Sequence, residues 1–148
     1  MANFATYREG TMASALERKA SAFNDIALLL ARILIAVLFL IASYNKFKGL
    51  GGSTAYFTKL GVPQPSVMAP VVAAFELAMG ILLLVGYKTR LVALALAVFV
   101  VIAALLAHTN FADGNQLNHF LKNLAIAGGC LVLFVTGAGA YSMDAKRR

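Results

Sequence analysis

Four long apolar runs constrain what this chain of 148 residues can fold into. They cover residues 26–44, 67–87, 91–107 and 124–141. Each run has about 17–21 residues, close to the roughly 20 that a helix needs to cross the bilayer core. Their apolar residues are continuous rather than alternating, which excludes the short strands of a membrane β-barrel. The runs therefore predict an all-α integral membrane protein, a bundle of four transmembrane helices.

Composition supports a membrane location. The chain is 61% hydrophobic and 13% charged, with a mean hydropathy of +0.80. A soluble domain carries about 25% charged and about 45–50% apolar residues, so this chain has too little polar surface to cover a soluble core. The net charge of +7 comes from basic residues near the ends of the apolar runs. This placement favours anionic lipid headgroups as the partner and argues against nucleic acid.

The positions of Lys and Arg predict the orientation of the chain. Eight of them fall on the side of the two chain ends and the second link, and four fall on the other side. The richer side belongs in the cytoplasm, so both ends are expected there. Residues 1–25 form a polar tail, with an interfacial helix and a frayed segment both open. Residues 26–144 form the membrane domain, and residues 145–148 a basic cytoplasmic tail.

The links and the small residues predict how the helices pack. The link at residues 86–90 is short and predicts a tight antiparallel hairpin of the second and third helices. The links at residues 46–66 and 108–120 are longer and face outward. Small residues four apart allow close helix approach in lipid and favour a compact bundle. These pairs are Ala74 and Ala78, Ala93 and Ala97, Ala103 and Ala107, and Ala125 and Gly129.

Glu76 is the most informative single residue, because it lies near the middle of the second run. It is about 15 Å from either end of that helix. A carboxylate at this depth must face the bundle, pair with a cation or be protonated. Arg32 in the first run is the expected partner, although it could also snorkel to the interface. A structural ion pair and a site for a substrate headgroup or proton relay both stay open.

A second polar cluster is expected at the outward-facing helix ends. Lys46 ends the first run, His108 ends the third, and Lys122 and Asn123 come just before the fourth. Lys46 follows Arg32 by fourteen residues and shares its helix face. A basic pocket of this kind could bind a quinone carbonyl or a small anion. The alternative is that these side chains only reach the lipid headgroups.

No metal site is predicted. His108, His119 and Asp113 lack the spacing of a metal-binding motif, and no second histidine lies in a helix to complete a bis-His haem site. Cys130, the one cysteine, falls inside the fourth run. A buried free cysteine of this kind is expected to pack as a small hydrophobe.

The chain resembles the DoxX family of small bacterial membrane proteins over residues 26–144. The resemblance rests on the order and spacing of short pieces rather than on any one of them. The pieces are Arg32, Lys46-Phe47, Leu60-Gly61-Val62-Pro63, Glu76 with Gly80, Gly86-Tyr87-Lys88-Thr89-Arg90, His108, Lys122-Asn123 and the segment from Gly137 to Asp144.

The resemblance implies a four-helix, multi-pass protein of the bacterial inner membrane. The family is named for a relative of a thiosulfate:quinone oxidoreductase subunit, and other members are linked to redox homeostasis and oxidative stress, often through partners. The sequence carries no flavin, haem or iron–sulfur motif. Electron transfer would therefore need a bound quinone or a partner subunit. Partner membrane or redox proteins, and a second copy of the chain, are the expected protein partners.

Three functional hypotheses follow. In the first, Arg32, Glu76, His108 and Lys122 line the pocket of a quinone-associated redox subunit, and protonation of Glu76 accompanies quinone reduction. In the second, the chain is a non-enzymatic scaffold or accessory subunit of a partner complex. In the third, which ranks last, it is a small-solute carrier, although the chain is short and shows no inverted repeat. The sequence leaves open whether the chain is an enzyme.

Overall fold

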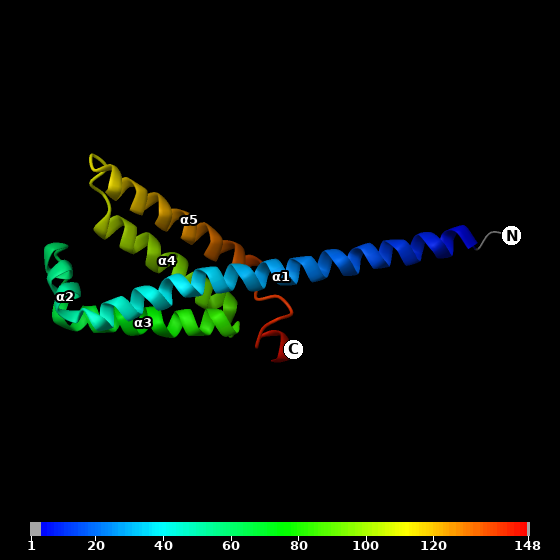
Figure 1. The fold of residues 1–148 in the computed structure, drawn as a ribbon, viewed down its shortest axis with the longest axis horizontal. Coiled ribbons are helices and arrows are strands. Elements are labelled where there is room, and N and C mark those ends of the chain that lie inside the picture. The colour runs from blue at the N-terminus through cyan, green and yellow to red at the C-terminus, as the bar shows by residue number, and fades with distance from the viewer. Residues whose placement is uncertain (1–3, 148) are drawn as a thin grey trace.

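The computed structural model describes the backbone of residues 4–147 and the side chains of residues 17 and 19–147. This part of the chain forms five α-helices and a short 3-10 helix (Figure 1). They are α1 Phe4–Lys48, α2 Leu50–Lys59, α3 Pro65–Val85, α4 Thr89–Ala107, α5 Gly114–Thr136 and η1 Ala145–Arg147. Four segments are long and apolar enough to cross a membrane, namely α3, α4, α5 and α1 from Lys19. The predicted all-α bundle of four membrane spans is confirmed.

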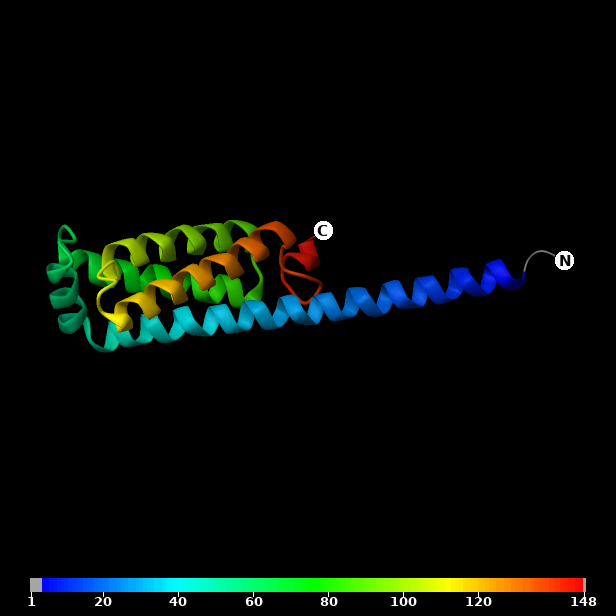
Figure 2. The same cartoon turned by 90° about the horizontal axis from the view of Figure 1, so that it is seen from above.

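The spans form two antiparallel pairs, α1 with α3 and α4 with α5. The pairs lie together at the end that carries the C-terminal tail, here called the inner end. They diverge toward the opposite, outer end, where α2 crosses the bundle (Figure 1). The N-terminal part of α1 and η1 both leave at the inner end, as expected for an even number of spans (Figure 2).

The predicted tight turn between α3 and α4 is confirmed, but the expected packing of these two helices against each other is wrong. Gly86 at φ +70° and Lys88 at φ +47° reverse the chain tightly. α3 nevertheless packs mainly along α1, and α4 mainly along α5. The reason is the small-residue face of α3. A Cβ on Gly80 would lie 3.0 Å from the Leu40 side chain, so glycine is what lets α1 approach α3 closely.

The predicted inward face of α3 is confirmed around Glu76. Ala69, Ala73 and Gly80 are buried together with Glu76. Ser43 of α1 donates a buried hydrogen bond of 2.7 Å to the Ala73 carbonyl oxygen, which fixes the register of the two helices.

Of the small-residue pairs expected to pack within the bundle, some are buried and others are exposed. Ala93 and Ala97 are buried in the core of α4, as expected. Ala74 and Ala78 lie on the exposed face of α3, so they do not pack within the bundle. Cys130 is fully buried in the core cluster, which confirms that it packs as a small hydrophobe.

The polar tail and the first span form one helix. α1 has 45 residues and passes residue 26 without a break. At 1.5 Å per residue it is about 68 Å long, so its N-terminal part projects beyond the bundle (Figure 2). An interfacial helix here would rest on apolar residues at helical spacing, among them Ala13 and Leu16, whose side chains lie outside the described residues. Phe23, farther along α1 at the same spacing, is exposed.

The fourth span begins ten residues earlier and ends five residues earlier than the apolar run at residues 124–141. The Asp113 carboxylate accepts a hydrogen bond of 2.9 Å from the Asn115 N–H and so caps the start of α5 at Gly114. Gly137 at φ +86° and Gly139 at φ +75° then turn the chain out of the helix. The run at residues 124–141 was misleading because α5 begins with polar turns, while apolar residues continue past its end.

The C-terminal segment closes the inner end of the bundle. The Met143 and Asp144 N–H groups donate to the Val85 and Gly86 carbonyl oxygens at 3.1 and 2.9 Å. The Asp144 carboxylate accepts from the N–H groups of Lys88 and Thr89 at 2.7 and 2.8 Å. A carboxylate in this position satisfies free donors at the start of α4 and interacts favourably with the helix dipole.

We expect Asp144→Ala to lower the free energy of unfolding by about 1–2 kcal/mol, because α4 loses its capping carboxylate. Thermal unfolding of the detergent-purified protein measures the loss. Asp113→Ala is the matched control, since Asp113 caps α5 with one hydrogen bond at an exposed position. Its loss should be smaller, and an Asp144→Ala variant as stable as the parent would contradict this role.

Candidate functional site: a cavity between the helix pairs

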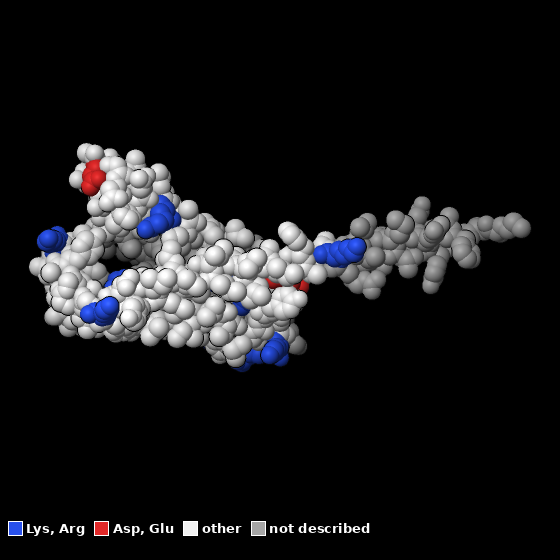
Figure 3. Space-filling view, viewed as in Figure 1, with Lys and Arg blue, Asp and Glu red and all other residues white. Residues whose placement is uncertain are grey.

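A cavity of about 540 Å³ lies between the two helix pairs at the outer end. The space-filling view shows the surface hollowed there (Figure 3). All five helices contribute to its wall, which is mostly aliphatic and aromatic. Its polar side chains include Asn45, Lys46, Glu76, His108, Lys122 and Asn123. The cavity therefore combines an apolar wall with a small set of polar groups, as ligand pockets do.

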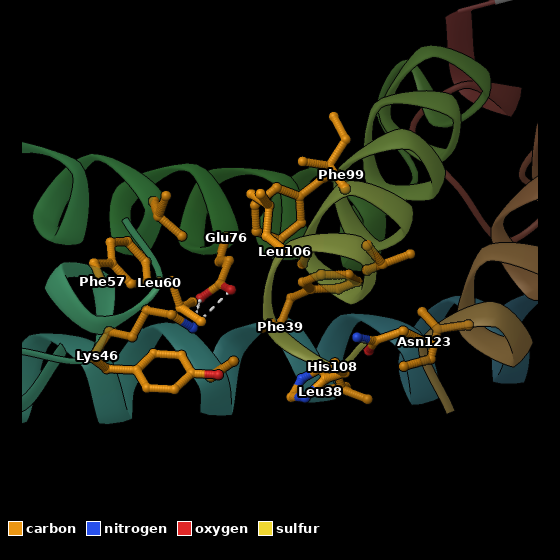
Figure 4. A pocket seen from close by; sticks show the side chains of 18 of the residues that line it. Leu38, Phe39, Lys46, Phe57, Leu60, Glu76, Phe99, Leu106, His108 and Asn123 are labelled. Carbon is orange, nitrogen blue, oxygen red and sulfur yellow. Dashed lines mark hydrogen bonds and ion pairs between the residues drawn. The ribbon is translucent and has the colours of Figure 1, made fainter. Parts of the chain in front are cut away.

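An ion pair of Lys46 and Glu76 is the central polar feature (Figure 4). Lys46 Nζ lies 2.8 Å from both carboxylate oxygens of Glu76. Side chains lean toward the N-terminus of their own helix, so in antiparallel helices Lys46 leans inward and Glu76 leans outward. Lys46 and Glu76 each come three residues after the hydrogen-bonded Ser43 and Ala73, so in antiparallel helices their backbones lie on opposite sides of that contact. The opposite lean of the two side chains brings their charged ends together.

The pair is asymmetric in its exposure. The Glu76 side chain is 6% exposed and the Lys46 side chain 24%. An ammonium group has three N–H donors. Two of them are directed to the two oxygens of the Glu76 carboxylate. Glu76 therefore neutralises and positions a partly exposed cation in the cavity wall.

The predicted pairing of Arg32 with Glu76 is wrong. Arg32 is fully buried at the inner end, where its Nη2 donates to the Tyr141 carbonyl oxygen of the C-terminal segment. It lies fourteen residues before Lys46, about 21 Å along the helix. Its burial also shows that it does not snorkel. Arg32 Nε and Nη1 make no hydrogen bond to any described residue. The guanidinium contacts the C-terminal segment and does not line the cavity.

His108 belongs to a polar cluster on the opposite side of the cavity. Its Nδ1 lies 2.7 Å from Gln116 Oε1, and its ring stacks on that of His119 with centroids 5.1 Å apart. Lys122 Nζ lies 3.1 Å from His119 Nδ1. Among the described residues, no three His, Cys, Asp or Glu side chains gather as a metal site.

Five of the six predicted site residues thus line one cavity, from three helices and the end of α4. They are Lys46, Glu76, His108, Lys122 and Asn123. Lys122 and Asn123 do not open the fourth helix as expected, since they lie more than two turns after its start at Gly114. This position brings both to the cavity wall, where Lys122 is exposed and Asn123 is partly buried.

Sequence reasoning missed the aromatic part of the wall. α2 lies within the long link at residues 46–66, for which no helix was predicted. It contributes Tyr56 and Phe57 to the cavity. Phe39 and Phe99 form the apolar wall deeper in the bundle, with ring centroids 6.4 Å apart. The available signal was the stretch of residues 50–62, which contains no proline and two adjacent aromatic residues.

Comparison with known proteins settles the family. The family model described as DoxX matches residues 27–109, more than half of the chain. The chain belongs to the DoxX family. This DoxX protein is 43% identical to inner membrane protein YqjF of Escherichia coli (strain K12) over 121 residues, covering 82% of this chain and 92% of YqjF. It is 33% identical to inner membrane protein YphA of the same strain over 130 residues, covering 84% of this chain and 93% of YphA.

A third relative, matched over about half of its length, is named as an oxidoreductase rather than as a membrane protein. The chain is 37% identical over 73 residues to a Bacillus subtilis (strain 168) protein named "Putative oxidoreductase CatD", covering 49% of this chain and 53% of CatD. No solved structure matches. The two relatives named as inner membrane proteins and the four spans together make this DoxX protein a multi-pass protein of the bacterial inner membrane.

Proposed function

We propose that this DoxX protein binds a quinone in the outer cavity and serves as the membrane subunit of a redox system. The cavity itself carries the proposal. Its volume of about 540 Å³ falls within the range of about 300–1,000 Å³ that is typical of small-molecule sites. Its wall is mainly apolar, and its polar groups come from segments far apart in the sequence.

The residues present suit the two ends of a quinone ring. The ring is flat and apolar on its faces, and its two carbonyl oxygens are acceptors on opposite sides. Lys46 lies on one side of the cavity, and His108 and Asn123 lie on the other (Figure 4). The ammonium of Lys46 and the amide of Asn123 are donors. Phe39 and Phe99 supply aromatic surface between them.

A bound quinone would supply the redox chemistry, taking up two electrons and two protons to give the quinol. This chain would bind and orient the ring. Glu76 and His108 are the cavity groups that can hold or give a proton near it. The electrons would come from a partner redox protein, since the sequence has no flavin, haem or iron–sulfur motif. The name of the partial relative CatD supports a redox setting.

Binding of a decyl-tailed benzoquinone to the detergent-purified protein tests the proposal. Glu76→Gln removes the carboxylate that positions Lys46. His108→Ala removes a polar group from the opposite wall. We expect each to weaken binding by at least about tenfold, or about 1.4 kcal/mol.

Glu17→Gln is the matched control, because Glu17 is exposed on the part of α1 that projects from the bundle. It should bind the quinone as the parent does. Parent-like binding by both cavity variants would contradict the proposed site.

A scaffold role is the second candidate, and the outward faces of the helices favour it. Ala74 and Ala78 of α3, and Ala125 and Gly128 of α5, are exposed. Small residues on a membrane-facing surface allow another transmembrane helix to approach closely. Under this alternative, affinity purification from native membranes would recover a stoichiometric membrane partner and no quinone, and partner recovery would fall in an Ala74→Leu/Ala78→Leu variant.

A further inference from the structure

We infer that the outer cavity takes a long-tailed quinone that enters sideways from the lipid, with its tail leaving between the two helix pairs. This inference rests on the proposed quinone site. It selects a lipid-borne ligand over a small water-soluble quinone or anion, and it assigns a route of entry.

Several cavity-lining side chains also face the surroundings of the bundle. Leu38 and Ile41 of α1 are 36% and 55% exposed. Ile102 and Leu106 of α4 are 50% and 55% exposed. All four lie inside membrane spans, where the surroundings of an exposed apolar residue are lipid. The cavity therefore reaches the lipid-facing surface on both helix pairs.

Leu38 and Ile102 lie deeper in the membrane than Lys46 and His108, the polar residues of the same two helices. Leu38 precedes Lys46 by eight residues, about 12 Å along α1. Ile102 precedes His108 by six residues, about 9 Å along α4. Apart from Glu76, whose backbone lies near the middle of α3, the cavity is therefore polar near the outer end and apolar toward the middle of the membrane. A ligand that matches this gradient has a polar head and an apolar tail.

The direct route from the outer aqueous side is narrowed by α2, which crosses the outer end of the bundle (Figure 2). Its Tyr56 and Phe57 side chains and the following Leu60 form part of the cavity wall there. The helix pairs diverge at this same end, because α1 packs on α3 and α4 on α5 rather than across the gap. The outer end of the cavity is thus partly covered by α2, whereas the openings between the two helix pairs are less closely packed.

Two probes with the same dimethoxy-methyl-benzoquinone ring test the route, one with a decyl tail and one without. Their association rates and affinities are measured for the full chain in lipid nanodiscs. An Ile41→Trp/Ile102→Trp variant narrows both sides of the cavity at the lipid. A Leu34→Trp/Val98→Trp variant is the matched control, because Leu34 and Val98 are exposed on the same helices and do not line the cavity.

We expect the first variant to bind the tailed quinone at least about tenfold more weakly while binding the tailless ring within about twofold of the parent. The control should bind both probes as the parent does. Equal loss of both probes, or no loss of either, would overturn the lateral route while leaving the quinone site in place. A parent that binds neither probe would overturn the quinone site itself, and the lateral route with it.

Discussion

Gly86→Ala is expected to lower the free energy of unfolding by at least about 3 kcal/mol. Gly86 has φ +70°, a conformation that costs a residue with a side chain about 1–2 kcal/mol. The added Cβ would also lie 2.6 Å from Ser142 Cβ and overlap the guanidinium of Arg32. Both neighbours are buried, so neither can move into open space. The methyl group would push the C-terminal segment off the inner end.

Gly61→Ala is the matched control. Gly61 also has φ +70°, but a Cβ there would meet nothing within 4 Å. The control should show the backbone cost alone, about 1–2 kcal/mol. Unfolding of both variants in detergent, followed by circular dichroism, measures the difference. Equal losses would mean that the crowding around Arg32 and Ser142 contributes nothing to stability.

Lys46→Met is expected to destabilise the protein by about 3 kcal/mol, because it leaves the Glu76 carboxylate buried without its partner. The double variant Lys46→Met/Glu76→Leu should recover most of that stability, since a buried ion pair replaced by apolar residues of similar size is often neutral. The recovered protein should no longer bind quinone, because both polar groups are gone. Folding and binding are thereby separated in one series.

A substitution at an exposed lysine of the same helix is the control for this series. Lys48→Met, two residues further along α1 at an exposed position, should change stability by no more than about 0.5 kcal/mol. Unfolding free energies of the parent, the single variants and the double variant form a double-mutant cycle. Strictly additive losses for Lys46 and Glu76 would show that the two side chains do not interact in the membrane.

The sequence predicts the spans and much of the site, because both depend on local pattern. Continuous apolar runs report membrane crossing directly. The cost of a carboxylate at mid-membrane depth predicts an inward Glu76. The grouping of Lys46 with His108 follows from their positions near the ends of spans that meet on one side of the membrane, whereas Asn123 reaches the cavity from more than two turns inside α5.

The remaining features depend on tertiary contacts that no local pattern carries. The partner of Glu76 is set by the register of α1 against α3, which the Ser43–Ala73 hydrogen bond and the close approach at Gly80 determine. That register places Arg32 at the inner end, where the returning C-terminal segment covers it. The segment itself looked like the end of a span, because its turn depends on two glycines at positive φ rather than on polarity.

The most direct test of the account is the quinone-to-protein ratio after extraction from native membranes into polymer-bounded lipid discs. The parent is compared with Ala42→Phe/Ala103→Phe, which fills the cavity from α1 and α4 without replacing any of its polar residues. Ala74→Phe/Ala125→Phe adds the same volume on exposed faces outside the cavity. We predict about one quinone per chain in the parent and in the exposed-face variant, and a strong loss in the cavity variant, as expected for a single specific site. An equal ratio in all three proteins would mean that any quinone present is bulk lipid, and would contradict the proposed site.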